Sequence, residues 1–190
     1  RCGMSESGSA SADLARIGRR VIAEGLVPGN SGNASLRTRS RFLVTRTGTF
    51  LDDPGPLVPV PFEGEIPAGA SRETLVHRTV FNLTPHRAIL HTHPPYAVAL
   101  SFDRESITPI DAEGMLLCPG IPVVTGDSGT QTLGDHVAHA LMHGKVAIAR
   151  GHGTFAAGGD LGEAYLVTAA AEHACRVLYL RQTLTGRRIG

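Results

Sequence analysis

The stretch Ala88-Ile89-Leu90-His91-Thr92-His93-Pro94-Pro95 decides how this chain is organised. Its short apolar run predicts a buried β-strand, and alternate side chains of a strand share one face. His91 and His93 are therefore expected to project together, while Thr92 points away. A polar side chain in a buried strand is costly unless it finds partners. Two imidazoles side by side supply half of the ligands of a zinc site, which satisfies both.

A second apolar run, Val146-Ala147-Ile148-Ala149, predicts a strand that leads into Gly151-His152-Gly153. His152 is the candidate for a third imidazole. Three neutral imidazoles leave a zinc ion its full charge and one open position, as in catalytic rather than structural sites. The sequence therefore predicts a bound Zn²⁺, with another divalent transition metal as the alternative.

Composition narrows the class of protein. The 190 residues suit one domain, and 42% hydrophobic with 18% charged residues is ordinary for a globular chain. A formal net charge of +1 gives no electrostatic case for nucleic acid, and no apolar run has the length of a membrane span. We expect a flexible tail over residues 1–12, without a signal peptide, and a single domain over 13–190. Three widely spaced cysteines without a C-x-x-C pair fit a reducing cytoplasm.

The spacing of apolar residues predicts helices and strands that alternate without a regular βαβ rhythm. The predicted helices cover residues 13–24, 71–83, 97–101, 132–143 and 161–183. The predicted strands include residues 42–45, 88–93, 121–124 and 146–149. Residues 28–35 and 107–114 are expected to be loops, and the proline-rich stretch 51–69 to hold loops and short edge strands. The sequence therefore predicts an α/β fold with a mixed sheet covered by helices.

Two loops and one helix start carry further polar groups. Residues 28–35 hold glycines, Asn and Ser that can bind an oxyanion, although a plain turn explains the same composition. The turn Arg46-Thr47-Gly48-Thr49 adds two hydroxyls and a cation. Ser71 suits a helix N-cap, and Glu73 suits a first turn, where the helix dipole favours a carboxylate. His77 follows one turn later, either packed near the same site or filling the helix face.

The chain resembles the class II aldolase/adducin family from about Leu14 to Leu184. The shared motifs are, in order, Gly32-Asn33-Ala34-Ser35, Thr47-Gly48, Ser71-x-Glu73, His91-x-His93 and Gly151-His152-Gly153. The resemblance implies αβα layers around a central, mixed and largely antiparallel sheet. It also implies a homotetramer with active sites at the subunit interfaces, acting on a phosphorylated small sugar.

The resemblance also assigns roles. The zinc ligands correspond to His91, His93 and His152, and the catalytic acid/base corresponds to Glu73. The cradle for the substrate phosphate corresponds to Asn33, Thr47, Gly48 and Ser71. The implied reaction is the reversible cleavage of a ketose 1-phosphate to dihydroxyacetone phosphate and an aldehyde through a metal-stabilised enediolate. L-Fuculose 1-phosphate, which gives L-lactaldehyde, is the leading candidate substrate.

Two departures from the family pattern concern the substrate. Arg72 stands where familiar members carry a second serine, which adds a cation beside the phosphate. A tyrosine that a family member places near residues 111–114 is absent, so Asp111, Glu113 or a zinc-bound water is the candidate proton donor on the aldehyde side. Same-fold alternatives are a pentulose 5-phosphate 4-epimerase, a methylthioribulose-1-phosphate dehydratase and a sugar-acid phosphate decarboxylase. A non-catalytic adducin-like module is disfavoured because the three histidines and Glu73 are all present.

Overall fold

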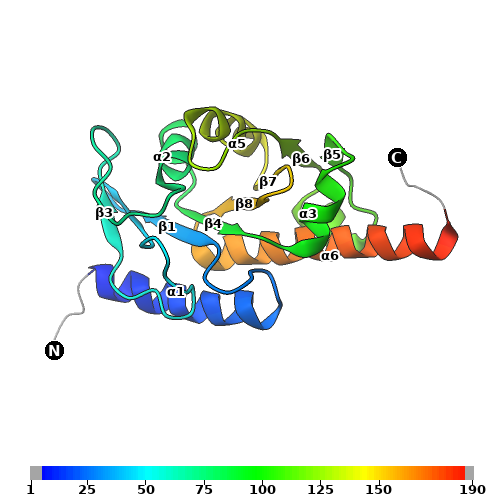
Figure 1. Cartoon of the computed structure of the whole chain (residues 1–190), viewed down its shortest axis with the longest axis horizontal. Coiled ribbons are helices and arrows are strands. Elements are labelled where there is room, and N and C mark those ends of the chain that lie inside the picture. The colour runs from blue at the N-terminus through cyan, green and yellow to red at the C-terminus, as the bar shows by residue number, and fades with distance from the viewer. Residues whose placement is uncertain (1–5, 187–190) are drawn as a thin grey trace.

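The computed structural model describes residues 6–186, in which eight strands form one sheet (Figure 1). The strands are β1 (Asn33–Arg37), β2 (Phe42–Val44), β3 (Val58–Val60), β4 (Ala88–Thr92), β5 (Ser106–Ile107), β6 (Ile121–Val124), β7 (Val146–Ala149) and β8 (Gly153–Gly158). Their order across the sheet is β3-β2-β1-β4-β8-β7-β6-β5. Neighbours are antiparallel except β6 and β7, which run parallel. The predicted mixed, largely antiparallel sheet is confirmed.

Helices cover both faces of this sheet. They are α1 (Glu6–Ala23), α2 (Thr74–Leu83), α3 (Pro95–Ser101), α4 (Ala112–Leu117), α5 (Gln131–His143) and α6 (Leu161–Thr185). The apolar sides of α2 and α5 share one core, whereas those of α1 and α6 lie in a core on the opposite face. Both α3 and α4 pack against α6. The predicted αβα layers are therefore confirmed. Within residues 6–186, no helix has the length and apolar character needed to cross a membrane.

Strand β4 shows how the sequence pattern selects a face. Ala88 and Leu90 belong to the core beneath α1 and α6, and Ile89 belongs to the core beneath α2 and α5. His91 lies two residues beyond Ile89 and so shares its face. β4 pairs with β1 on one side and β8 on the other, and all five of its residues are buried.

Four segments differ from the sequence-based expectation. Helix α1 begins at Glu6, so residues 6–12 are helical rather than a tail, while residues 1–5 lie outside the described residues. β1 occupies part of the expected loop 28–35, and β8 follows His152 where the sequence predicts no strand. Both strands consist largely of small or polar residues, and pairing on both sides outweighs their weak strand propensity. Helix α4 replaces part of the loop at 107–114 because the Asp111 carboxylate caps it, accepting from the Gly114 N–H at 2.9 Å.

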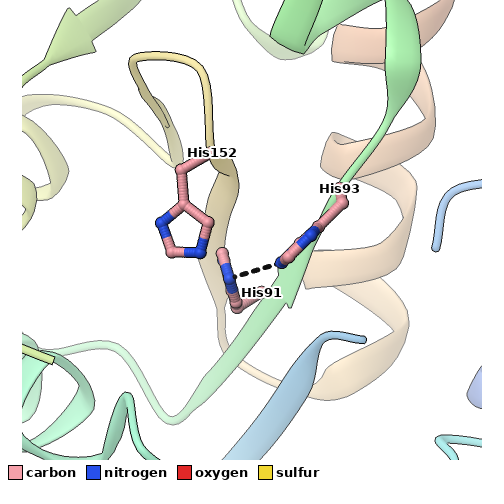
Figure 2. A group of neighbouring side chains, drawn as sticks. All are labelled: His91, His93 and His152. Atoms are coloured by element: carbon pink, nitrogen blue, oxygen red, sulfur yellow. Dashed lines mark hydrogen bonds between the residues drawn. The ribbon is translucent and has the colours of Figure 1, made fainter. Parts of the chain in front are cut away.

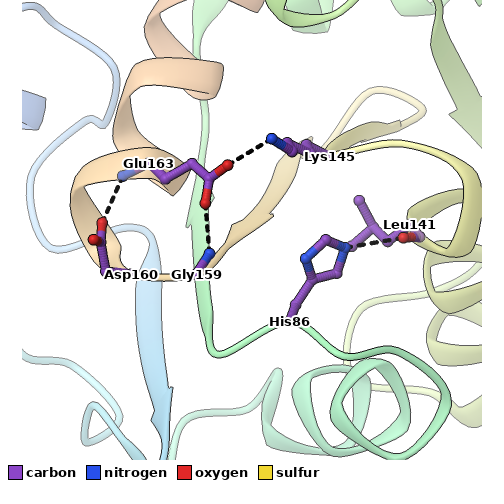
Figure 3. A network of polar contacts seen from close by, with 6 residues as sticks. All are labelled: His86, Leu141, Lys145, Gly159, Asp160 and Glu163. Carbon is purple, nitrogen blue, oxygen red and sulfur yellow. Dashed lines mark hydrogen bonds and ion pairs between the residues drawn. The ribbon is translucent and has the colours of Figure 1, made fainter.

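The start of α6 engages the only lysine of the sequence. Lys145 Nζ lies 2.5 Å from Glu163 Oε1, and the Gly159 N–H donates to the other oxygen of that carboxylate at 2.6 Å (Figure 3). The hydrogen bond from Lys145 holds the pKa of Glu163 below its usual value. Asp160 caps α6 by accepting from the Glu163 N–H at 2.8 Å. Lys145 therefore has a structural role: it joins the residue before β7 to the first turn of α6.

Helix α2 is fixed to the sheet by a buried histidine. The Ser35 hydroxyl oxygen on β1 lies 2.6 Å from His77 Nδ1. Burial lowers the pKa of His77 to about 3, so its ring is neutral in the folded protein. The ring of Phe155 lies 6.2 Å from that of His77 and stacks on that of His91 at 4.1 Å. His77 thus packs close to the predicted metal ligands and also fills the core.

The neutral state of His77 makes folding stability depend on pH. Its folded-state pKa of about 3 lies below the ordinary value of 6.5, so the unfolded chain binds more protons below pH 6.5. The contribution of His77 to the free energy of unfolding is fully present above pH 6.5 and is lost as the pH falls toward 3. We expect urea unfolding of the metal-free protein to show a steep loss of unfolding free energy between about pH 6.5 and 5, up to roughly 1.4 kcal/mol per pH unit for this group. A His77→Asn variant should show a shallower loss. The exposed His173→Asn serves as the matched control, and equal slopes for His77→Asn and native protein would contradict the assignment.

Candidate functional site

Three histidine rings meet at one end of the sheet (Figure 2). His91 lies on β4, His93 lies just beyond that strand, and His152 lies on the turn between β7 and β8. Their ring centroids are 4.7 to 5.1 Å apart. One ligand nitrogen from each ring lies within 4.8 Å of the other two. Within residues 6–186, no other group of three His, Cys, Asp or Glu side chains meets that criterion.

The hydrogen bond of His91 presents its other nitrogen toward this meeting point. Its Nδ1 lies 2.9 Å from the Thr154 carbonyl oxygen, which can only accept, so Nδ1 carries the proton and Nε2 offers a lone pair. Nε2 of His91 lies 3.0 Å from Nε2 of His93. With Zn–N bonds of about 2.0–2.1 Å, nitrogens of a tetrahedral site are roughly 3.3 Å apart. The spacing of this pair is within a few tenths of an ångström of that requirement, and a nitrogen of His152 lies within 4.8 Å of both, so the three residues can gather around a metal ion.

Burial also prepares these rings for a metal. It lowers the pKa of His91 well below the usual value and that of His93 to about 4, helped in both by the neighbouring rings. Both imidazoles are therefore neutral near pH 7. A neutral imidazole is the form that binds metal, so little proton competition opposes binding there.

The two glycines around His152 allow it to approach the other rings. Gly151 has φ +66°, a left-handed conformation that favours glycine, and a Cβ there would lie 2.8 Å from the Phe102 ring. A Cβ on Gly153 would lie 2.2 Å from the Thr92 carbonyl oxygen and 3.0 Å from the His93 ring. A side chain at Gly153 would therefore displace the site, whereas at Gly151 it is the left-handed backbone that favours glycine.

Glu73 lies at the start of α2, is 3% exposed and lines the same cavity as the triad. Its N–H donates to the Ser71 hydroxyl oxygen at 3.3 Å. The predicted roles of these two residues in the helix are wrong: α2 begins only at Thr74, so Glu73 rather than Ser71 is its N-cap, and Glu73 does not lie in the first turn. Its carboxylate accepts one hydrogen bond from the Ser128 hydroxyl and another, at 3.1 Å, from the Gly129 N–H. The Glu73 carboxylate is not a member of the three-histidine group.

A cavity of about 460 Å³ joins the triad, Glu73 and the polar loops. Its lining comprises Asn30, Ser31, Gly32, Asn33, Arg46, Thr47, Gly48, Ser71, Arg72, Glu73, His91, His93, Ser128 and His152. Most site residues predicted from the sequence thus line one space. Asp111 and Glu113 do not line it, because they lie at the start of α4, which packs on α6.

The part of the cavity that holds the predicted phosphate ligands is built from loops tied to one another. The Thr47 hydroxyl donates to the Ala70 carbonyl at 2.7 Å, and Asn30 Nδ2 donates to the Gly48 carbonyl at 3.2 Å. Gly48 has φ +81°, which places it in the left-handed region. The side-chain oxygen of Asn33 is buried and has no hydrogen-bond partner. This oxygen only accepts, so its partner would be an O–H or N–H donor from a ligand or water. Separately, the guanidinium groups of Arg46 and Arg72 line the cavity and favour an anion there.

Ser128 is the lining residue that the sequence does not reveal. It lies in the segment 125–130 between β6 and α5, whose Gly, Asp, Ser and Thr residues match any surface turn. Its role depends on the packing of α5 against α2, which places residues 73 and 128 together. No local pattern carries that information.

Comparison with known proteins places the chain in a family. The family model of the Class II Aldolase and Adducin N-terminal domain matches residues 12–179. The crystal structure of the L-fuculose-1-phosphate aldolase from Thermus thermophilus is similar, with a TM-score of 0.90 and 35% identity over 96% of this chain and 99% of that chain.

Two curated relatives are named for activities that differ from each other. The chain is 29% identical to a methylthioribulose-1-phosphate dehydratase of Pseudoalteromonas translucida, over 84% of this chain and 85% of that protein. It is 30% identical to a 5-methylthioribulose-1-phosphate/5-deoxyribulose-1-phosphate aldolase of Escherichia coli O45:K1, over 73% and 68% respectively. The family model, the 0.90 structural match and the three-histidine site agree with the resemblance seen in the sequence. This chain therefore belongs to the class II aldolase and adducin family.

Proposed function

We propose that this protein is a metal-dependent aldolase that reversibly cleaves a ketose 1-phosphate to dihydroxyacetone phosphate and an aldehyde. L-Fuculose 1-phosphate, which gives L-lactaldehyde, is the leading candidate. The observation that carries the proposal is the joining of the histidine triad, a buried carboxylate and a polar anion cradle in one cavity. The similarity to the Thermus thermophilus aldolase over nearly the whole of both chains supports the choice of reaction.

The metal would be held by His91, His93 and His152. Zinc is our choice of ion because three imidazoles with an open position are typical of catalytic zinc, and another divalent transition metal is the alternative. When bound, the ion supplies a Lewis acid for the negative charge that develops on substrate oxygens. The Lys145 amine is engaged with Glu163, outside the cavity, so the chain offers no lysine there for a Schiff base.

The substrate phosphate would lie among Asn33, Thr47, Gly48 and Ser71. Amide N–H groups of this cradle and the Ser71 hydroxyl would donate to the phosphate oxygens, and the Arg72 guanidinium adds a positive charge among the lining residues. Binding at the phosphate fixes the distance from that group to the triad. The fixed distance selects which carbon–carbon bond of the sugar stands beside the reacting groups.

Glu73 would act as the acid/base. Its carboxylate is buried beside the triad, in the cavity that also contains the cradle, so it can reach a carbon or hydroxyl of a bound sugar phosphate. We propose that it accepts a proton when the donor fragment is activated and returns the proton to that fragment after the bond breaks.

Self-association would complete the site. We propose a homotetramer with the cavity near a subunit boundary, so that Asp111 or Glu113 reaches a neighbouring cavity as a proton donor. Exposed apolar side chains beside these carboxylates support a covered surface. They are Met115, Leu116 and Leu117 on α4, with Tyr179, Leu180 and Leu184 on α6.

The dehydratase is a second candidate. It is favoured by the 29% identity to the Pseudoalteromonas translucida enzyme over most of both chains. The two reactions share the metal, the phosphate cradle and a proton-transferring carboxylate, and differ in whether a carbon–carbon bond or a carbon–oxygen bond breaks.

Product analysis tests the proposal. Zinc-loaded protein is incubated with L-fuculose 1-phosphate, 5-deoxyribulose 1-phosphate, methylthioribulose 1-phosphate, a pentulose 5-phosphate and a sugar-acid phosphate. We expect dihydroxyacetone phosphate, measured with a coupled dehydrogenase, from at least one ketose 1-phosphate. Loss of water, loss of one carbon, or inversion at C4 as the main outcome would assign the protein to a dehydratase, decarboxylase or epimerase instead.

Replacing Glu73 by Gln tests its role. The amide is nearly isosteric but cannot take up a proton, so we expect turnover to fall by about 10²- to 10⁴-fold. Zinc content should remain at the native level, because the three histidines are unchanged. Steady-state kinetics and metal analysis of the purified variant provide both measurements. Turnover within a factor of about two of native would exclude Glu73 as the acid/base.

A further inference from the structure

Helix α3 connects two of the three histidine segments. It begins at Pro95, two positions after His93, and packs against α6 (Figure 1). Its other end lies against the turn between β7 and β8, which carries His152. The helix therefore spans from the end of β4 to that turn, and each of its ends is held by hydrogen bonds.

The start of α3 is held by one carboxylate from α6. The two prolines at its start have no N–H, so the first free amides of the helix are those of Tyr96 and Ala97. The Tyr96 N–H donates to Glu172 Oε1 at 3.0 Å, and the Ala97 N–H donates to Oε2 at 2.8 Å. Glu172 is only 9% exposed, and a carboxylate that is so buried needs such partners. This one side chain therefore fixes the backbone three positions after His93.

The end of α3 is bonded to the turn between β7 and β8. The Gly151 N–H donates to the hydroxyl oxygen of the fully buried Ser101 at 2.8 Å. Arg150 Nη1 donates to the carbonyl oxygens of Ser101 at 2.7 Å and of Phe102 at 3.0 Å. These contacts hold the two residues that precede His152.

Two of the three rings depend on their backbone for orientation. The Nδ1 atom of His91 bonds the Thr154 carbonyl, a type of second contact that usually orients a metal-binding histidine. Among residues 6–186, the His93 ring bonds only the His91 ring, and the His152 ring has no hydrogen-bond partner. The separation of His93 and His152 therefore depends on the chain segments that carry them, which α3 connects.

We propose that Glu172 and Ser101 are positioning residues for the metal. By fixing the two ends of α3, they make this helix a brace that sets the separation of His93 and His152. Neither residue lines the cavity, so both act through the ligands. This inference rests on the proposed metal site, but it does not depend on which sugar phosphate is the substrate or on which bond breaks.

Replacing either positioning residue should weaken zinc binding. Glu172→Gln keeps the shape of the side chain, but the new amide nitrogen cannot accept a hydrogen bond, so one N–H of α3 loses its partner. Ser101→Ala removes the hydroxyl that accepts from Gly151. We expect the zinc affinity of each folded variant, measured by chelator competition without sugar, to fall by about tenfold or more, since residues behind metal ligands change affinity by about 10- to 100-fold. The visible absorption of the Co²⁺-loaded variants should shift as well.

The double variant, Glu172→Gln with Ser101→Ala, tests the brace itself. A brace needs both of its ends, so releasing the second end should add little once the first is free. We therefore expect the combined loss of zinc affinity to be smaller than the product of the two single losses. A combined loss equal to that product would indicate two independent supports and would overturn the brace.

Three further variants separate positioning from charge and from general destabilisation. Glu172→Asp keeps the charge but is too short to bond both amides, so its zinc affinity should also fall. Asp160→Ala removes the cap of α6, and Thr84→Ala removes a buried hydroxyl that donates to the Val80 carbonyl at 2.8 Å. Both of these controls should lower the midpoint of urea unfolding while zinc affinity stays native.

Three results would contradict the inference. The first is native zinc affinity in Glu172→Gln or in Ser101→Ala. The second is native affinity in Glu172→Asp, because the effect of glutamine would then be one of charge. The third is an equal loss of affinity in Asp160→Ala and Thr84→Ala, which would attribute the effect to destabilisation. All readings are made without substrate, so failure of the aldolase proposal leaves them intact.

Discussion

The antiparallel pairing of β4 with β8 is the constraint on which the site depends. His91 faces Phe155 and Thr92 faces Thr154 across these strands, and the stacked Phe155 ring and the Thr154 carbonyl orient the His91 imidazole. The same pairing places the turn that carries His152 beside the end of β4. His91 and His152 lie 61 positions apart in the chain. Their rings meet because β4 and β8 pair with each other in the middle of the sheet. A slip of one residue would turn His91 to the opposite face.

The other polar groups that line the cavity come from different elements, which approach the same end of the sheet as the triad. The phosphate side comes from the loop before β1 and the turn after β2, and the Ser71 N–H bonds the Thr45 carbonyl at 3.0 Å to join the start of α2 to them. The carboxylate comes from the start of α2, and the segment before α5 holds it. The three histidines, the polar loops and the Glu73 carboxylate thus come from separate elements of the fold. This separation explains how one fold serves relatives with aldolase and dehydratase activities.

Periodic patterns revealed much of this arrangement. The alternation in residues 88–93 predicts the shared face of His91 and His93, and the ordered motifs predict the layers and most of the cavity lining. Strands β1 and β8 were not predictable because Asn33–Arg37 and Gly153–Gly158 have little local strand propensity and exist through pairing on both sides. Ser128 was missed for a related reason: its contact with Glu73 arises from helix packing. The cap that the Asp111 carboxylate provides to α4 was also not predicted, because residues 107–114 have no clear helical pattern.

Zinc binding by histidine variants is the measurement that tests the central claim most directly. The native protein should bind one zinc ion per chain, and His152→Ala should lose that ion, because the open turn between β7 and β8 supplies the third ligand to a pair held on β4. His139→Ala, which changes an exposed histidine on α5, should bind zinc as the native protein does. Native stoichiometry and affinity in His152→Ala would contradict the account.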